Sequence, residues 1–246
     1  MVRPQAADGL IDSYAHWRSS RLGVTTDRLE QELLLELLGS VAGETLLDVG
    51  CGDGAFATAL ARRGAQVTGL DPDQAMVVAA RQRANREAVP VTVVEGKGEA
   101  LPFHADTFDV TIAVTSLCFI RDAAQAIAEM ARVLKPGGRL VIGELDRWSL
   151  WALQRRVRGW LGNPTWRAAA FRTAAELRSL VEAAGLEVTA IRGAAFYPPS
   201  LFAAELLAPV DDWVGRATTL GAAFIAVSAK KPFLSEDRGA SVDDIL

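Results

Sequence analysis

Short apolar runs alternate with amphipathic stretches over most of the chain. The runs are rich in Val, Leu and Ile, and each is short enough for one buried strand. They cover residues 44–50, 65–71, 91–96, 108–117 and 139–145. The stretches between them place apolar side chains at helical spacing, and these predicted helices cover residues 25–39, 53–64, 73–87 and 122–134. Strands that alternate with helices predict a doubly wound, Rossmann-like α/β fold with a mostly parallel sheet and helices on both faces.

The pattern changes in the last third of the chain. A helix over 172–185 and a strand over 186–193 continue the alternation, but the strand predicted over 221–231 has no clear helical pattern directly before it. The segment 193–219, between these strands, is punctuated by proline and looks like an insertion. The two late strands bring the predicted sheet to seven strands.

Composition and charge fit an ordinary globular domain. The chain has 246 residues, 50% of them hydrophobic, and a formal net charge of -4, which gives no reason to expect nucleic acid as a partner. The first residues lack the apolar core of a signal peptide, and the longest apolar run is too short to span a bilayer, so we expect a cytoplasmic protein. The two cysteines, Cys51 and Cys118, have no metal-binding spacing, and no metal site is predicted.

The strongest local feature is the loop LLDVGCGDGAFA over residues 46–57, which follows a predicted strand and opens a predicted helix. Its glycines satisfy a loose G-x-G-x-x-A, so spacing alone leaves a dinucleotide site and an S-adenosylmethionine site open. There is no G-K-[ST], which excludes a P-loop. Asp53, inside the loop, would oppose a pyrophosphate at the helix N-terminus. Together with Asp48 it suits a cationic ligand, and S-adenosylmethionine carries a sulfonium and an ammonium group.

Asp71 closes the second predicted strand. In doubly wound folds an acid at this position accepts hydrogen bonds from the ribose hydroxyls of a bound nucleoside. Both NAD and S-adenosylmethionine contain such a ribose, so Asp71 indicates a nucleoside without choosing between them. The alternative is that Asp71, followed by Pro72, is the N-cap of the next helix.

Four segments in order carry a family resemblance. They read DVGCGDG, GLDPDQAM, EGKGEALPFHADTFDVTIAV and RVLKPGGRLVI. Together they resemble the successive motifs of class I S-adenosylmethionine-dependent methyltransferases, and most nearly the methyltransferase type 11 group, which includes quinone-biosynthesis enzymes. The resemblance covers roughly residues 40–145. It implies a final strand antiparallel to the others, a role that the run at 221–231 fits.

The resemblance also implies where S-adenosylmethionine binds. The glycine loop would hold its methionine part, Asp71 its ribose, and Thr115 would face the methyl end. The cofactor-binding residues implied in this way are Asp48, Gly50, Cys51, Gly52, Asp71, Pro72, Met76, Gly98, Glu99, Ala100 and Thr115. Lys97 stands where similar proteins carry an acid, and a lysine cannot accept a hydrogen bond from the adenine amino group. We expect Lys97 to point to solvent, with Glu99 or backbone groups serving instead.

Similar enzymes cover the cofactor with an N-terminal segment, and residues 1–39 are the corresponding part here. Tyr14 is the expected cofactor contact in this segment, and His16 is the candidate for a catalytic base. Methyl transfer mainly needs alignment of the acceptor and exclusion of water, so a catalytic constellation is not required, and the sequence contains none that can be recognised. The methyltransferase domain is expected over 40–232 and a flexible tail over 233–246.

Two stretches that the family motifs do not explain are candidates for the acceptor pocket. Residues 147–172 are rich in tryptophan and arginine, and residues 193–219 are apolar with several prolines. We interpret both as substrate lids for a small apolar or aromatic acceptor. For 147–172 two alternatives stay open, namely ordinary helix packing and a helix that lies on a membrane surface. A prenylated quinone would fit both a lid and peripheral membrane contact.

The sequence therefore predicts S-adenosylmethionine-dependent methyl transfer to a small-molecule acceptor. One alternative is an NAD(P)-dependent oxidoreductase. Another is a methyltransferase fold that binds the cofactor without catalysis. Neither the acceptor atom nor the oligomeric state follows from the residues.

Overall fold

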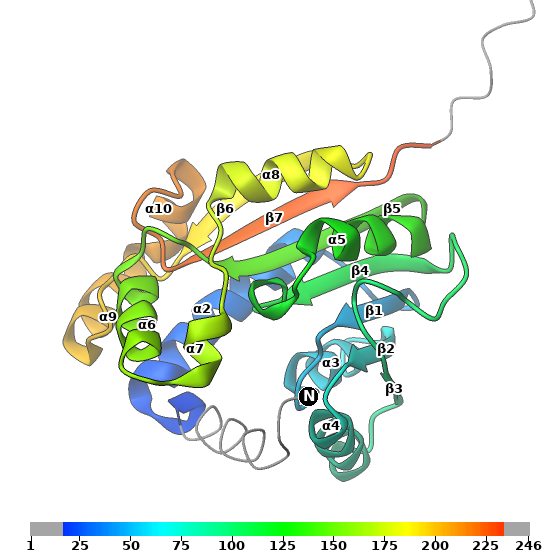
Figure 1. Ribbon diagram of the computed structural model, residues 1–246, viewed down its shortest axis with the longest axis horizontal. Helices are drawn as coiled ribbons and strands as arrows, with labels where there is room; N and C mark the ends of the chain where they lie inside the picture. The colour runs from blue at the N-terminus through cyan, green and yellow to red at the C-terminus, as the bar shows by residue number, and fades with distance from the viewer. Residues whose placement is uncertain (1–16, 234–246) are drawn as a thin grey trace, which may run out of the picture.

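Seven strands form one sheet in the order β3-β2-β1-β4-β5-β7-β6 (Figure 1). They are β1 (Thr45–Val49), β2 (Gln66–Asp71), β3 (Val91–Glu95), β4 (Phe108–Val114), β5 (Leu134–Leu145), β6 (Glu187–Ala194) and β7 (Phe224–Lys230). Neighbouring strands from β3 to β5 are parallel, whereas β7 runs antiparallel to both β5 and β6. The computed structural model describes residues 17–233, and the fold class predicted from the sequence is confirmed there.

Helices cover both faces of this sheet (Figure 1). Buried side chains of α2 (Arg21–Leu38) and α3 (Ala55–Ala61) pack on one face, and those of α5 (Ala123–Val133) and α8 (Ala174–Ala183) pack on the other. α4 (Gln74–Glu87) lies along β2 and β3. The central strands are therefore buried from both sides, which explains why they read as continuous apolar runs.

Two elements begin earlier than the apolar pattern indicates. The side chain of Ser20 caps α2 by accepting a hydrogen bond from the amide of Gly23. The helix therefore starts before the leucine stripe that Leu29, Leu33 and Leu37 form along it. β5 starts at Leu134, directly after α5, because Leu134 pairs with Phe108 of β4. Residues 135–138, which lie between the predicted helix 122–134 and the predicted strand 139–145, thus belong to the strand.

The strand order reverses between β1 and β4. From β1 the chain continues outward to β2 and β3, whereas from β4 it continues in the opposite direction to β5. The loops that follow β1 and β4 therefore diverge and leave a crevice at the carboxyl ends of the strands. In open α/β sheets this is the place where ligands bind.

The two stretches outside the family motifs fold into short helices that follow the carboxyl ends of β5 and β6. They comprise α6 (Leu150–Trp160), α7 (Pro164–Ala168), α9 (Leu201–Leu207), η2 (Ala208–Val210) and α10 (Asp211–Ala217). Trp151 of α6 donates its indole N–H to the carbonyl of Tyr197 (2.8 Å), and the Tyr197 hydroxyl lies 3.0 Å from Oγ1 of Thr26 in α2. These buried contacts fix both stretches to α2.

Asp211 fixes the second stretch in a further way. Its buried carboxylate accepts hydrogen bonds from the backbone amides of Ala195 (2.9 Å) and Phe196 (2.8 Å). Ala195 has a positive φ of 61°, a conformation that is strained for a residue with a side chain. The two hydrogen bonds from Asp211 therefore hold the chain in the bend where it leaves β6.

Candidate functional site

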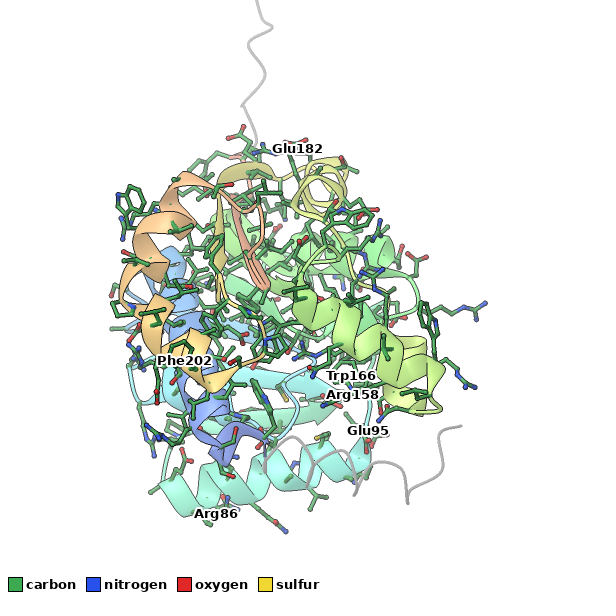
Figure 2. The ribbon with its side chains drawn as sticks, turned by 90° about the vertical axis from the view of Figure 1, so that its left-hand side faces the viewer. Arg86, Glu95, Arg158, Trp166, Glu182 and Phe202 are labelled. Carbon is green, nitrogen blue, oxygen red and sulfur yellow. The ribbon has the colours of Figure 1, made fainter. Side chains whose placement is uncertain are left out.

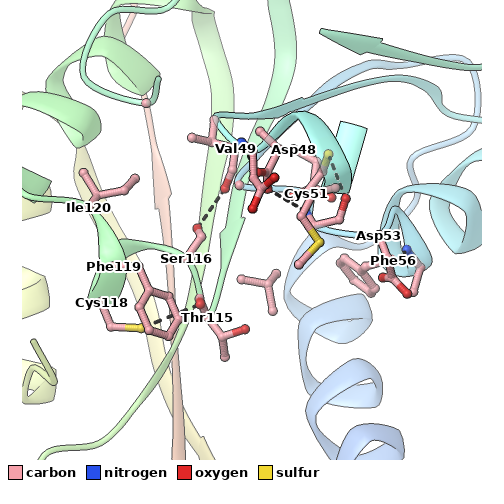
Figure 3. A pocket seen from close by; sticks show the side chains of 18 of the residues that line it. Asp48, Val49, Cys51, Asp53, Phe56, Thr115, Ser116, Cys118, Phe119 and Ile120 are labelled. Atoms are coloured by element: carbon pink, nitrogen blue, oxygen red, sulfur yellow. Dashed lines mark hydrogen bonds between the residues drawn. The ribbon is translucent and has the colours of Figure 1, made fainter. Parts of the chain in front are cut away.

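A cavity of about 610 Å³ opens at the carboxyl ends of β1, β2 and β4 (Figure 3). Ten residues predicted to bind the cofactor line it, namely Asp48, Gly50, Cys51, Gly52, Asp71, Pro72, Met76, Gly98, Glu99 and Thr115. Ala100 is exposed and does not belong to the wall. Tyr14 and His16 lie outside the described residues. The structure thus brings together residues from three of the four sequence motifs and Thr115, which directly follows the third, and what each of them binds stays a prediction.

The glycine loop requires glycine for steric reasons. Gly50, Gly52 and Gly54 have φ values of 76°, 54° and 76°. The amide of Gly50 donates to the carbonyl of Leu70 (2.7 Å), and a Cβ atom at Gly50 would lie 2.4 Å from Cβ of Ser116. Positive φ is available to glycine at little cost. The loop therefore presents bare backbone to the cavity.

Asp71 forms one wall of the cavity and braces the glycine loop. One carboxylate oxygen accepts a hydrogen bond from the amide of Gly52 and the other from the amide of Asp73, both at 2.9 Å. Burial raises the pKa of Asp71, and these two hydrogen bonds oppose the rise. The N-cap of α4 is Asp73, which accepts from the amide of Ala75, so the interpretation of Asp71 as an N-cap is wrong. Each oxygen of Asp71 keeps a lone pair that can accept a ligand hydroxyl.

Asp48 is buried at the end of β1 and lines the same cavity. Burial raises its pKa to about 7, and the negative charge of Asp71 adds to the rise. No basic side chain of the described residues forms an ion pair with Asp48. A cationic ligand group in the cavity would therefore stabilise the carboxylate form.

Asp53 is paired with basic side chains and does not play the part expected from the sequence. Its carboxylate forms ion pairs with Arg83 of α4 and, at 3.5 Å, with Arg18. Arg83 also donates to the backbone carbonyl of Asp53 (2.9 Å). The charge of Asp53 is therefore compensated by the protein, and the inference that it repels a phosphate or attracts a cation is wrong. In this loop, Asp48 is the acid that has no ion pair within the described residues.

The segment after β3 closes the side of the cavity where the resemblance places adenine. Gly98 is buried, and a Cβ atom there would lie 2.9 Å from Cδ1 of Ile120 and 3.1 Å from Cγ1 of Val49. Lys97 is exposed, as expected, although part of it borders the cavity. Glu99 is half-buried in the wall and can accept a hydrogen bond that Lys97 cannot.

The turn after β4 forms the wall opposite the glycine loop (Figure 3). Thr115 has a positive φ of 48°, which is rare for a β-branched residue, and its amide donates to the carbonyl of Gly143 (2.7 Å). The hydroxyl of Ser116 donates to the carbonyl of Val49 (2.8 Å) and joins the two walls. Cys118 is buried, and burial holds the pKa of its thiol well above the usual range, so it contributes a small neutral side chain.

The remaining wall combines aromatic rings with two ionisable groups. Glu30 of α2 and Arg155 of α6 line the cavity together with Trp17, Phe119 and Trp166. Burial raises the pKa of Glu30 to about 8, and the charge of Arg155 opposes this rise. Glu30 was not predicted from the sequence, because it stands among several other acids on a predicted helix. The leucine stripe could have placed it near the buried face, but not beside a cavity.

The two proposed lid stretches differ in their relation to this cavity. From 147–172, the side chains of Arg155, Thr165 and Trp166 reach the wall. None of the residues in 193–219 lines it. The second stretch instead packs on α2 and β6, so its contribution to the site is to support α2.

Fold and cavity together define a doubly wound α/β protein with a cavity at the point where the strand order reverses, which is where such folds bind ligands. The family model of the methyltransferase domain Methyltransf_11 matches residues 47–142. The chain is 35% identical over 229 residues to the uncharacterised protein Rv2003c of Mycobacterium tuberculosis, covering 93% of this chain and 75% of the relative. It is 33% identical over 165 residues to the ubiquinone biosynthesis O-methyltransferase of Methylobacterium sp. (strain 4-46), covering 65% of this chain and 66% of the relative.

The fold is also similar to that of solved methyltransferase structures. An S-adenosylmethionine-dependent methyltransferase from Thermotoga maritima superposes with a TM-score of 0.71 and 23% identity, over 92% of this chain and 98% of that one. The chain belongs to the type 11 group of class I S-adenosylmethionine-dependent methyltransferases. The predicted enzyme class is confirmed, and none of these matches favours the oxidoreductase alternative.

Proposed function

We propose that the chain binds S-adenosylmethionine in the 610 Å³ cavity and transfers its methyl group to a small apolar or aromatic acceptor held in the same cavity. The observation that carries the cofactor part is the pair of buried carboxylates, Asp48 and Asp71, that flank the glycine loop. Neither forms an ion pair with a basic side chain of the described chain. A nucleoside with a cationic amino acid attached is complementary to this pair.

The residues present fit that group. Asp71 offers two oxygens to a ribose, Asp48 offers a negative charge to the methionine end, and Gly50 lets the backbone approach closely. When bound, S-adenosylmethionine supplies an electrophilic methyl group on a positively charged sulfur. The protein positions the acceptor and excludes water, which are the main requirements of this chemistry. The walls from α2 and α7 serve those two purposes.

The proposed acceptor class follows from the wall opposite the glycine loop. Phe119 and Trp166 have ring centroids 6.1 Å apart, and both line the cavity with Trp17. Flat aromatic walls favour a flat or apolar acceptor. Relatives named as a ubiquinone biosynthesis O-methyltransferase and a demethylmenaquinone methyltransferase support a quinol-type compound as the first class to test.

The first experiment separates the cofactor from its main competitor. Calorimetric titration of the purified protein with S-adenosylhomocysteine should show binding, whereas titration with NADH should not. Labelled S-adenosylmethionine supplied with hydroquinones and phenols then tests transfer. Binding of NADH alone would overturn the proposal, and cofactor binding without transfer to any small molecule would support a non-catalytic role.

Asp48 gives the cofactor proposal a pH signature. Its pKa of about 7 in the free protein should fall when the ammonium group of S-adenosylhomocysteine binds, so a protonated Asp48 must release its proton. At pH 7 we expect release of about half a proton and an affinity that increases from pH 6 to pH 8. Titration in two buffers with different ionisation enthalpies measures the release. Asp48→Asn should abolish it, and an unchanged release in that variant would contradict the assignment.

We also propose that α6 lies on a membrane surface. No helix within residues 17–233 is long and apolar enough to cross a bilayer. α6 nevertheless exposes Leu150, Leu153, Val157 and Trp160. Arg158, which is labelled in Figure 2, is exposed on the same helix. Exposed tryptophan and leucine next to arginine suit an anionic lipid surface.

Co-sedimentation with vesicles tests this membrane contact. The protein should be retained by vesicles that contain phosphatidylglycerol, and Trp160→Ser should reduce retention at least about threefold. Trp213→Ser, which removes an equally exposed tryptophan from α10, is the matched control and should change little. Equal retention of all three proteins, or none, would contradict a role for α6.

A further inference from the structure

Glu30 is a carboxyl group placed in the cavity without a structural role that explains it. It is half-buried on α2, and it lines the cavity that also holds the glycine loop. No hydrogen bond or ion pair joins its carboxylate to another residue of the described chain. By contrast, its neighbour Glu32 faces solvent and pairs with Arg28. A carboxyl group that lines a cavity and has no partner in the described chain is available to a ligand.

Arg155 is held beside the same space. Its guanidinium group lies 5.4 Å from the ring centroid of Trp151 and 5.1 Å from that of Trp166. Trp166 in turn contacts Phe119. Two aromatic faces thus fix a positive charge at the wall, within electrostatic range of Glu30.

We propose that Glu30 is the general base for an acceptor with an aromatic hydroxyl group, and that Arg155 stabilises the developing oxyanion. The inference rests on the proposed methyltransferase function and adds the acceptor class to it. Phe119, Trp166 and Trp17 supply flat apolar contacts for the aromatic ring. Neither Glu30 nor Arg155 lies in a family motif quoted from the sequence.

The step balances without any further reagent. The acceptor O–H bond breaks as its oxygen forms a bond to the transferred methyl group, and the proton goes to the Glu30 carboxylate. The electron pair of the broken carbon–sulfur bond stays on sulfur, which leaves as a neutral thioether. Arg155 lowers the free energy of the oxyanion character that the acceptor oxygen gains before transfer.

The ionisation of Glu30 suits this role. Burial raises its pKa to about 8, Asp27 adds to the rise, and Arg155 and Arg18 oppose it. Tyr197 also lies within electrostatic range and has a raised pKa of its own. A base with a pKa near the working pH combines availability with proton affinity. Because Glu30 must be deprotonated to act, the rate should increase with pH up to about pH 8.

The test compares Glu30→Gln with Glu32→Gln, a matched change on the exposed side of the same helix. The substrates are catechol, hydroquinone and 4-nitrophenol with labelled S-adenosylmethionine. We expect E30Q to lower kcat at least about 100-fold and to lose the rise of kcat with pH, while E32Q matches the wild type. E30D should restore part of the rate, and Arg155→Met should lower kcat about tenfold or more.

Binding and stability measurements separate the competing explanations. S-adenosylhomocysteine should bind E30Q and the wild type alike, and catechol should quench the tryptophan fluorescence of both complexes with affinities within about threefold. As pH increases toward about 8, the wild type should lose stability relative to E30Q. The reason is that a carboxyl group with a raised pKa destabilises the folded state when it ionises.

Each alternative outcome contradicts either the proposed function or the assignment of Glu30 as the base. If the wild type does not bind S-adenosylhomocysteine, the proposed function fails. If it binds but methylates no phenol, or if E30Q keeps the wild-type kcat, the base assignment fails while the cofactor assignment stands. A parallel loss of kcat and of probe affinity would instead identify Glu30 as a binding carboxylate, and methylation of amines alone would support that reading.

Discussion

Gly50→Ala should lower the free energy of unfolding by about 2–5 kcal/mol and abolish detectable binding of S-adenosylhomocysteine. The backbone at Gly50 has a φ of 76°, and a new Cβ atom would lie 2.4 Å from Cβ of Ser116. Ser116 cannot yield freely, because its hydroxyl bonds to the carbonyl of Val49. The glycine loop must therefore move, and with it the backbone that faces the cavity.

Two matched variants separate backbone strain from the steric clash. Gly43 has a similar φ of 80°, but a Cβ atom there would meet no atom within 4 Å. Gly43 also lies away from the cavity, so Gly43→Ala tests backbone strain alone. Gly52→Ala also finds open space, but inside the cavity wall. Both variants should lose about 1–2 kcal/mol of stability, and only Gly52→Ala should weaken the binding of S-adenosylhomocysteine. Thermal unfolding and calorimetry measure the two effects, and a Gly50→Ala protein as stable as Gly43→Ala would contradict the clash.

The sheet was predictable from the sequence because local pattern and tertiary environment agree there. β1, β2 and β4 are buried on both sides, so their apolar runs identify them without knowledge of their neighbours. The start of β5 was not predictable, because it depends on the pairing of Leu134 with Phe108. Pairings between distant strands leave no local trace.

Site residues were predictable from the sequence where their position depends only on nearby residues in the chain. The glycines of the loop and Asp71 occupy positions that follow from strand ends, and the structure places them in one cavity. The charge of Asp53 was misjudged, because its partner Arg83 lies on a different helix. Glu30 was missed because the apolar pattern of its own helix gives no sign that the space beside it is a cavity, whose wall comes from other parts of the chain.

Asp71→Ala is expected to weaken binding of S-adenosylhomocysteine about 10- to 100-fold. The change removes the charged group that we propose as the acceptor of two ribose hydroxyl bonds. It also leaves the amides of Gly52 and Asp73 without their present partner, which loosens the glycine loop. Asp71→Asn keeps an oxygen acceptor but not the charge, so its loss of affinity should be smaller.

Asp211→Ala provides the control that distinguishes ligand contact from general destabilisation. Asp211 is likewise a buried carboxylate that accepts two backbone hydrogen bonds, but it lies outside the cofactor cavity. Both alanine variants should lose about 1–3 kcal/mol of stability, because each leaves two amide groups unpaired. Only Asp71→Ala should change the affinity measured by calorimetry. Equal affinity losses in the two variants would mean that Asp71 acts by supporting the fold, and the ribose contact would then have to be made by another residue of the cavity wall.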